Sequence, residues 1–477
     1  PRAGCLVRHQ IPADESGGKI QSCFGGRNDF SLRDGDAVSR LVNMLFFMKR
    51  TSKVARAGIV AVSCIFCLIG CAHICHCKTK SFNGFEVAPY FIYTPDHHIL
   101  MKFALAGDQI QKPPLLTVNG SVKNYQYQED KISGLAEVDI GAVACDQEVK
   151  VALTGAEEKS GDNSSISFQI PSSPCCADKE ISFVFIADTH GNSSFYEREM
   201  PFILKRHRDK NIIAIIHGGD WVNVGTDLVG WNQMAYAAGQ AGSAYPILSA
   251  IGNHEYHGYT SWAKMQNQPE PQQPQKGNSK NPVIFKKYFF GSENDQSHGY
   301  SRTGYYSVHY PQTVLIFINS NFNNLSDGDR EAQWSFIKRE LTVAESEKKP
   351  FLIVSHHSLL GSNLFRINKI EGKLLREKLI PILEEQRQKF KFTANAVNHN
   401  LPMIAVLSAH GHLSEESEKN GIHYLNAGTF GGWPMFGLWG NPYKKTSSSL
   451  SSTYSIITVS NRGISIDTYQ QIAGIWQ

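Results

Sequence analysis

Nearly continuous runs of Val, Ile, Leu, Phe and Ala recur in the second half of this chain. They cover Ile181–Ala187, Ile212–Ile216, Phe351–Val354 and Ile404–Leu407. Such runs are typical of strands buried on both faces. Stretches with helical patterning lie between them, including Arg330–Leu341 and Lys373–Gln386. Alternation of strand and helix predicts a sheet flanked by helices, so this half belongs to the α/β class.

The region from Phe85 to about Pro174 has another pattern, with short segments of alternating apolar and polar residues. Turn residues such as Thr94-Pro95-Asp96 and Val118-Asn119-Gly120 separate the segments. This pattern predicts a β-sandwich. We expect strands at Tyr90–Tyr93, His98–Phe103, Leu115–Val118, Gly134–Ile140, Val149–Leu153 and Ile166–Ile170. The predicted domains are therefore an all-β domain at 85–178 and an α/β domain at 179–477.

Five polar clusters lie in the α/β region, and four of them directly follow an apolar run. The clusters are Asp188-Thr189-His190, Gly219-Asp220, Gly252-Asn253-His254-Glu255, His356-His357 and His410-Gly411-His412. Open α/β sheets build their sites at the carboxyl ends of parallel strands, so these side chains are expected to converge. Their carboxylate, amide and imidazole groups suit a pair of divalent metals, which would clamp the attacking and leaving oxygens of a phosphoryl transfer.

The order and spacing of the five clusters resemble the calcineurin-like metallophosphoesterase superfamily, from Ile181 to the C-terminus. The resemblance implies a β-sandwich core flanked by helices, in four layers α/β/β/α. The region before it, with Ala88-Pro89-Tyr90 at its start, is similar to the fibronectin-like N-terminal domain of purple acid phosphatases. The family's fold and site are therefore our expectations for residues 179–477.

The resemblance also implies a ligand for each metal position. The first metal would be held by Asp188, His190 and His412, the second by Asn253, His356 and His410, and Asp220 would bridge the two. Neighbouring side chains on a strand point in opposite directions, so one of His356 and His357 is expected to ligate. We favour His356, with His357 as the alternative, because His356 directly follows its strand.

Catalysis in this family implies roles for two further groups. His254 would donate a proton to the leaving oxygen or contact the transition state. A hydroxide shared by the metals would be the nucleophile, because metal binding lowers the pKa of water. The ligand types accept Fe, Mn or Zn, so the two divalent ions are not identified by the sequence.

Three positions depart from the family's patterns. Asn223 stands where purple acid phosphatases have an iron-binding tyrosine, and His190 stands where they have glycine. Ala409 replaces the usual glycine before the final His-x-His. The chain therefore resembles purple acid phosphatases, but we do not expect the colour that their bond between tyrosinate and iron produces.

The predicted activity is hydrolysis of phosphate esters, with phosphomonoesters favoured. A phosphodiesterase or nucleotide pyrophosphatase uses the same metal pair and stays open as an alternative. A catalytically inactive surface binding protein is a third interpretation, although the predicted metal ligands and His254 are all present. The sequence has no cysteine after Cys176, which excludes a thiol nucleophile in that region.

Alternative roles stay open for other residues near the predicted pocket. His217 is expected in the core or behind the ligands, whereas His257, His298 and His309 could line the pocket or lie on the surface. Tyr256, Trp433 and Phe436 are candidates for its rim, because pockets favour aromatic walls.

The segment that begins at Met48 resembles a bacterial lipoprotein signal. Basic residues precede an apolar run, Ala57–Gly70, of 14 residues, short of the ~20 that span a membrane. The run ends Leu68-Ile69-Gly70-Cys71, which resembles a lipobox. We therefore expect a signal peptide at 48–70, a tether at 71–84, and an exported protein anchored by lipid to the cell envelope. Residues 1–47 are expected to be non-native upstream translation, or alternatively the tail of a protein with one transmembrane helix.

Charge and cysteine content add two expectations. The net charge of +4 over 477 residues, with no basic stripe, argues against a nucleic-acid surface. In an oxidising compartment Cys145 could bridge to Cys175 or Cys176, and the sequence does not choose between them.

Overall fold

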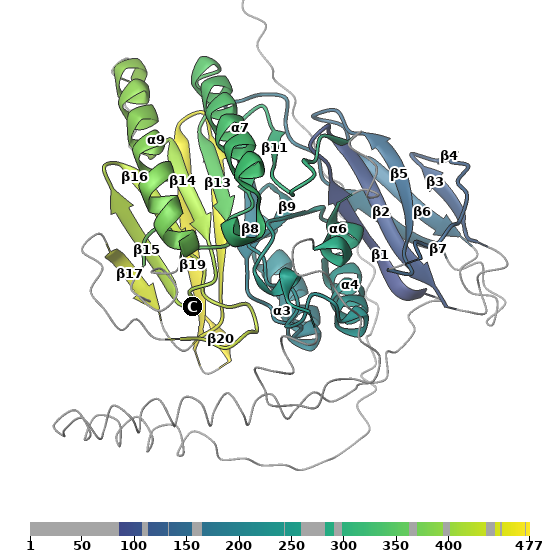
Figure 1. Ribbon diagram of the computed structural model, residues 1–477. Helices are drawn as coiled ribbons and strands as arrows, with labels where there is room; N and C mark the ends of the chain where they lie inside the picture. Colours follow the sequence, from purple (N-terminus) through teal and green to yellow (C-terminus); the bar gives the residue numbers. More distant parts are fainter. Residues whose placement is uncertain are drawn as a thin grey trace, which may run out of the picture. The chain divides into compact units, whose positions relative to one another are not determined.

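The structure is a computed structural model, drawn in Figure 1. It describes residues 85–106, 113–131, 133–154, 165–242, 244–258, 282–290, 298–361, 370–394, 401–435, 444–448, 451–472 and 474–477. The predicted signal peptide, lipobox and tether lie outside these residues, as do residues 1–47 and Phe436. Within the described part of the chain, no helix is both long and apolar enough to cross a membrane.

Two sheets contain the strands predicted for the α/β region. The nine-stranded sheet runs in the order β20 (Ile475–Trp476), β19 (Gly463–Ile472), β18 (Thr453–Ser460), β8 (Ile181–Ile186), β9 (Ile212–His217), β10 (Ile247–Ser249), β1 (Phe85–Tyr93), β2 (His98–Leu105) and β5 (Ala136–Ala142). The seven-stranded sheet runs in the order β11 (Tyr306–His309), β12 (Val314–Ile318), β13 (Phe351–Ser355), β14 (Ile404–Ser408), β16 (Ile422–Asn426), β15 (Ser414–Lys419) and β17 (Lys444–Ser448). Each sheet is parallel at its centre, at β8-β9-β10 and at β12-β13-β14-β16.

Helices cover the outer faces of both sheets. They are α3 (Ser193–Arg206), α4 (Leu228–Gly242), α6 (Val283–Phe289), α7 (Asp327–Ser346) and α9 (Ile370–Ala394), with short 3₁₀ helices η2 (His254–Tyr256) and η4 (Phe322–Asn324). Figure 1 shows α7 and α9 side by side over the sheet that contains β13 and β14. Helix α7 begins after Ser326, whose side chain accepts a hydrogen bond from the Asp329 backbone N–H.

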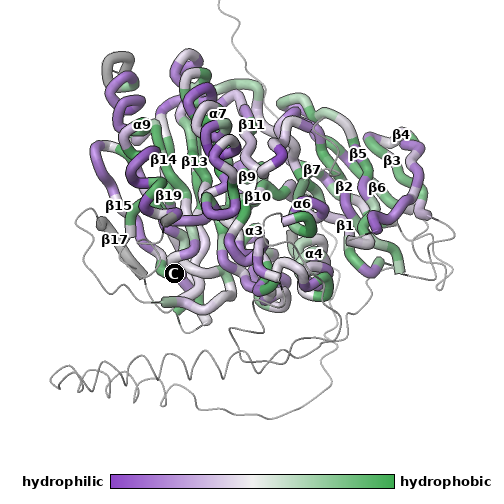
Figure 2. Tube along the Cα trace, viewed as in Figure 1, coloured by the Kyte–Doolittle hydropathy of each residue, from purple (hydrophilic) through white to green (hydrophobic). Residues whose placement is uncertain are grey.

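Successive residues of a central strand face two different apolar cores, which explains why these strands are largely apolar. In β12, Leu315 and Phe317 join the core shared by the two sheets, while Val314, Ile316 and Ile318 pack in the core beneath α7 and α9. Every residue of β8, β9, β13 and β14 is buried. Figure 2 shows these central strands as hydrophobic and the outer faces of α7 and α9 as largely hydrophilic. The predicted α/β class and its metallophosphoesterase layering are confirmed.

The N-terminal strands continue the nine-stranded sheet. Strand β1 pairs in parallel with β10 through Ile92 and Ile247. A third sheet, in the order β4 (Ser121–Val122), β3 (Leu115–Val118), β6 (Val149–Thr154) and β7 (Ser165–Ile170), packs on β1, β2 and β5 around a separate apolar core. Hydrogen bonding within one sheet therefore crosses the domain boundary that the sequence placed between residues 178 and 179.

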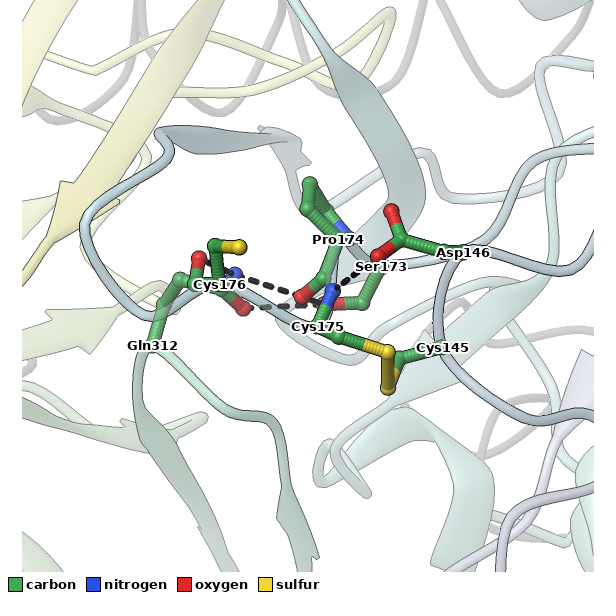
Figure 3. Close-up of a disulfide and its surroundings, with 7 residues drawn as sticks. All are labelled: Cys145, Asp146, Ser173, Pro174, Cys175, Cys176 and Gln312. Carbon is green, nitrogen blue, oxygen red and sulfur yellow. Dashed lines mark hydrogen bonds between the residues drawn. A yellow bond between two sulfur atoms is a disulfide. The ribbon is translucent and has the colours of Figure 1, made fainter. Parts of the chain in front are cut away.

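A disulfide joins two loops at the base of this N-terminal region (Figure 3). Cys145 bonds to Cys175, with Cα atoms 5.0 Å apart, and Cys176 is an exposed free thiol. This settles the choice that the sequence left open. Next to it, the Gln312 side chain accepts a hydrogen bond from Ser173 Oγ at 2.8 Å and donates to the Pro174 carbonyl at 2.8 Å. The connection into β8 is thus held both covalently and by hydrogen bonds.

Candidate metal centre

The predicted polar clusters meet where the parallel strands of both sheets end. Asp188 and His190 follow β8, and Asp220 follows β9. His356 follows β13, and His410 and His412 follow β14. All six side chains are buried, which is unusual for carboxylates and imidazoles unless they share a partner.

The backbone at this edge adopts an uncommon conformation. Five predicted ligands have positive φ: Asp188 (52°), His190 (49°), Asp220 (60°), His410 (63°) and His412 (52°). Non-glycine residues seldom adopt the left-handed region, and clusters of such residues are found at functional sites. The left-handed turns after β8, β9 and β14 therefore aim these side chains toward one centre.

Two glycines let the turns approach each other closely. A Cβ on Gly252 would lie 2.1 Å from Asp220 Oδ1, and a Cβ on Gly219 would lie 2.6 Å from the Gly252 backbone nitrogen. No side chain fits in either space. The Gly219-Asp220 and Gly252-Asn253 segments thus pack backbone against backbone.

The first ligand group contains Asp188, His190, Asp220 and His412, whose ligand atoms lie within 4.8 Å of one another. His190 Nε2 is 3.0 Å from His412 Nε2 and 3.8 Å from Asp220 Oδ2. Asp188 Oδ2 accepts a hydrogen bond from the His410 backbone N–H at 3.0 Å. The other oxygen, Oδ1, lies 3.6 Å from His412 Nε2.

The second ligand group contains Asp220, His356 and His410, again within 4.8 Å. His356 Nε2 lies 3.2 Å from Asp220 Oδ2, 3.0 Å from Asn253 Oδ1 and 3.2 Å from His410 Nδ1. Asp220 Oδ1 accepts a hydrogen bond from the His254 backbone N–H at 2.9 Å, which holds Oδ2 toward the imidazoles. Asp220 is the carboxylate common to both groups.

The donor set fits divalent metal ions. His356 Nδ1 lies 2.9 Å from the Gly218 carbonyl and His412 Nδ1 lies 2.6 Å from the Trp433 carbonyl, so each Nδ1–H donates outward and each Nε2 faces the centre. Metal-binding histidines are held in this way in proteins. Imidazole nitrogens that face one another around carboxylate oxygens are satisfied together by a cation. The site is therefore a buried metal-binding cluster.

Charge within the cluster shifts the pKa values of its members when no metal is bound. Burial opposes the charge on His356, but the Asp220 carboxylate outweighs it and raises the pKa of His356 to about 9. Burial would likewise raise the pKa of Asp220, yet the His356 and His254 charges hold that pKa well below its ordinary value. In the metal-free protein at neutral pH, a proton on His356 takes the place of positive charge that a metal would supply.

His254 lies beside the cluster and is oriented toward it. Its Nδ1 lies 2.7 Å from the Asn223 carbonyl, so Nδ1–H donates there, and Nε2 lies 3.9 Å from Asp220 Oδ2. The ring packs edge-on to His190 at 4.5 Å between centroids. Its side chain is 17% exposed, so it can reach both the cluster and a bound substrate.

Asn223 has a structural role here. The Asn223 side-chain amide donates a hydrogen bond to the His190 backbone carbonyl at 2.8 Å. The Asn223 backbone carbonyl accepts a hydrogen bond from the His254 ring. The residue that replaces the tyrosine of purple acid phosphatases thus positions one predicted ligand and the predicted acid.

Glu255 is a positioning residue to which the sequence gave no role. Its carboxylate accepts backbone hydrogen bonds from Asp220 at 2.9 Å, Trp221 at 2.8 Å and Gly252 at 2.7 Å. Burial, with the Asp220 charge added, raises the pKa of Glu255 to about 7. Its place beside His254 in the Gly-Asn-His-Glu cluster was the available signal.

The remaining candidates separate into core and surface positions. His357 bonds to Ser320 Oγ at 2.9 Å, whereas His356 occupies the cluster. His217 is buried and stacks on Trp221, as expected for a core residue. Tyr256 is 6% exposed and accepts from Asn319 at 2.7 Å, so its predicted place on the rim is wrong.

Three more histidines and Ala409 complete the set. His298 pairs with Asp96 at 3.0 Å and His309 pairs with Glu340 at 2.8 Å. Neither partner belongs to the metal-binding cluster. His257 packs on the His254 ring at 4.5 Å. The methyl group of Ala409 is accommodated in the core, fully buried.

Comparison with known proteins agrees with this geometry. Residues 181–413 match the family model described as calcineurin-like phosphoesterase. A purple acid phosphatase from seeds of yellow lupin (Lupinus luteus) has a similar structure, with a TM-score of 0.56 and 14% identity over 82% of this chain and 73% of that chain. PhoD is similar with a TM-score of 0.53 and 12% identity, over 84% of this chain and 93% of that chain. A sequence search among curated proteins finds no match.

Proposed function

We propose that this protein hydrolyses phosphomonoesters with two divalent metals. The chain belongs to the calcineurin-like phosphoesterases through residues 181–413 and is a metal-dependent phosphoesterase. The observation that carries this proposal is Asp220 Oδ2. It lies 3.8 Å from His190 Nε2 of one ligand group and 3.2 Å from His356 Nε2 of the other. A carboxylate shared between two ligand groups is the arrangement that a bridged metal pair requires.

Each side chain then has a distinct task. Asp188, His190 and His412 would hold one metal, and Asn253, His356 and His410 the other, with Asp220 common to both. When bound, the metals would lower the pKa of water toward neutrality and stabilise charge on the phosphoryl oxygens. Fe, Mn or Zn would each suit these nitrogen and oxygen donors.

His254 is proposed as the proton donor. Its Nδ1–H is engaged by the Asn223 carbonyl at 2.7 Å, so the Nε2 side faces the reacting phosphate and would deliver a proton to the leaving oxygen. Glu255 does not touch the substrate in this scheme. It holds the backbone of Asp220 and Gly252 so that the bridging carboxylate stays in place.

The proposal is tested by turnover on a panel of phosphomonoesters, phosphodiesters and nucleotides, with metal content measured on the same sample. We expect the highest kcat/KM on a monoester, and activity that falls when a chelator removes the metals. Preference for a diester or a pyrophosphate bond would replace the monoesterase proposal with the alternative activity. Full metal content without turnover on any member would support an inactive binding protein.

We further propose that the protein is exported and lipid-anchored at Cys71. The disulfide between Cys145 and Cys175 supports an oxidising compartment. Labelled fatty acid should be incorporated into the expressed protein, and Cys71→Ser should abolish the labelling. A soluble, unlabelled protein with Cys71 intact would overturn the anchor without affecting the phosphoesterase proposal.

A further inference from the structure

Trp433 is an exposed indole on the segment that contacts the metal-binding cluster. Its side chain is 50% exposed. The other tryptophans among the described residues are buried: Trp221, Trp231, Trp334 and Trp476. A single exposed apolar residue needs no explanation by itself. What sets Trp433 apart is the position of its segment and the contacts that tie the segment to the predicted ligands.

The backbone of Trp433 is linked directly to a predicted ligand. Its carbonyl accepts a hydrogen bond of 2.6 Å from His412 Nδ1, and the Met435 backbone N–H donates to the His412 carbonyl at 2.7 Å. His412 Nε2, on the other side of the same ring, lies 3.0 Å from His190 Nε2. One imidazole ring therefore separates the Trp433 backbone from the metal-binding atoms.

The glycines before Trp433 hold the segment against the turn that follows β8. A Cβ on Gly432 would lie 2.3 Å from the Asp188 carbonyl oxygen and 2.8 Å from the His190 ring. The Gly431 carbonyl accepts from the Asn192 side chain at 2.8 Å, and the Gly432 carbonyl accepts from Thr429 Oγ1 at 2.9 Å. These contacts hold the backbone that precedes Trp433 against the turn that carries Asp188 and His190.

We propose that Trp433 is the specificity residue of this site, and that it packs against a planar aromatic group carried by the phosphate ester. This deepens the proposed function and depends on it. An indole offers a large flat apolar face at small entropic cost, and aromatic rings stack on such a face. Phosphate bound at the buried cluster would leave the organic part of the ester outside it, and the exposed Trp433 has its backbone one imidazole ring from the cluster. The aromatic group could be a nucleobase or a simple aryl ring, and both have the same flat π surface.

The test compares pairs of phosphomonoesters in which one member carries an aromatic ring and the other does not. One pair is adenosine 5′-monophosphate and ribose 5-phosphate; the other is benzyl phosphate and cyclohexylmethyl phosphate. In each pair the ester bond is alike, so the ratio of kcat/KM values isolates the ring. Trp433→Ala should lower kcat/KM for the aromatic member by about tenfold, mainly through KM, which corresponds to about 1.4 kcal/mol. The saturated member should change by less than about twofold.

Two variants control for damage to the fold. Trp433→Phe keeps a flat ring and should restore most of the preference. Phe202→Ala removes another exposed aromatic residue, 49% exposed on α3, and should alter neither pair. A fall in metal content in Trp433→Ala would show that the segment and not the indole was lost. In that case Trp433→Phe alone decides, because it must then keep both metal and preference.

Each result has a defined meaning. An effect on the nucleotide pair only identifies a nucleobase; an effect on the benzyl pair only identifies a compact aryl ring; an effect on both supports any aromatic ester. Equal losses on the two members of both pairs, or no loss on any, would overturn the role of Trp433 while leaving the phosphoesterase intact. No turnover by the metal-loaded wild type on all four substrates would instead overturn the proposed function, and this inference with it.

Discussion

Left-handed backbone conformations occur both in the N-terminal sheets and at the site edge of the catalytic sheets, but they have different roles in the two regions. In the N-terminal region, positive φ occurs at His97 (67°), Asn119 (50°) and Asp146 (57°), in the connections between strands. The His97 N–H donates to the Thr94 carbonyl within its turn, and Asn119 precedes Gly120 in the hairpin between β3 and β4. These residues serve to reverse the chain.

At the site edge, the left-handed residues are buried and follow parallel strands. Asp188 and Asp220 are fully buried there, whereas His97 is half-buried and Asn119 and Asp146 are exposed. Strained backbone and buried charge each cost stability and persist where the surroundings determine them strongly. The site edge therefore gives up stability to hold its ligands, whereas the left-handed residues of the N-terminal turns only reverse the chain. Paired variants of the two regions test this contrast.

The largest contrast is expected between two aspartates in the same backbone conformation. Loss of a hydrogen-bond partner of a metal ligand costs about 10–100-fold in metal affinity, so Asp220→Asn, which removes a shared ligand, should cost more, roughly 10³-fold, at both positions. Asp146→Asn keeps the acceptor for the Cys175 backbone N–H, now 3.0 Å away, and Asn tolerates positive φ. Asp146→Asn should therefore keep wild-type metal content and rate. Full metal occupancy and turnover in Asp220→Asn would refute the bridging role.

The second contrast compares two histidines. His254→Ala should retain metal and lose about 10²-fold in kcat, the usual scale for a removed general acid. His298→Ala removes the partner of Asp96, which lies 3.0 Å from the His298 ring. Neither residue is a predicted metal ligand, so kcat should stay unchanged. Substrates whose leaving group needs no proton should lose less in His254→Ala. An equal loss for every leaving group would point to electrostatic stabilisation of the phosphoryl oxygens and not to proton transfer.

A third prediction concerns pH. The pKa of His356 is raised to about 9 in the metal-free protein, so a metal must displace a proton from this ring at neutral pH. Apparent metal affinity should therefore rise by up to about tenfold per pH unit between pH 6 and 8, and level off above 9. Without metal, the free energy of unfolding should instead fall as pH rises. The charged His356 stabilises the fold below its ordinary pKa, and this contribution is lost as pH rises through 9. Competition with a chelator of known affinity measures the first effect, and pH-independent binding would contradict it.

The smallest effect on turnover is expected from the disulfide. Cys145→Ala opens a bridge between residues 30 apart in sequence, which should lower the free energy of unfolding by about 3 kcal/mol. The rate of the folded, metal-loaded enzyme should stay within about twofold of wild type, because no ligand depends on this loop. A large loss of kcat in folded Cys145→Ala would show that the two regions are coupled more tightly than the contrast assumes.

Much of the catalytic half was predictable, because its signals are local. The run Phe351–Val354 differs from β13 by one residue, and Ile404–Leu407 differs from β14 by one residue. Helix α7 begins three residues before its predicted start, and the Ser326 and Asp329 cap gave a signal for that boundary. The clusters could be placed together because chain order fixes which side chains leave the same edge of a parallel sheet.

What the sequence could not supply depends on contacts between distant segments. The pairing of β1 with β10 joins Ile92 to Ile247, and neither strand carries a pattern that names its neighbour. The role of Glu255 rests on three backbone N–H groups, which are the same for any residue type. The burial of Tyr256 was missed for a related reason, since its partner Asn319 lies in another motif.

The central claim is tested most directly by turnover measured as a function of metal bound per chain. Metal-free protein is titrated with Mn(II) or Zn(II), and bound metal and phosphomonoester hydrolysis are followed on the same samples. We expect saturation at two ions per chain, with activity that develops as both positions fill, because Asp220 belongs to both ligand groups. Full activity at one ion per chain, or activity that survives complete removal of metal, would contradict it.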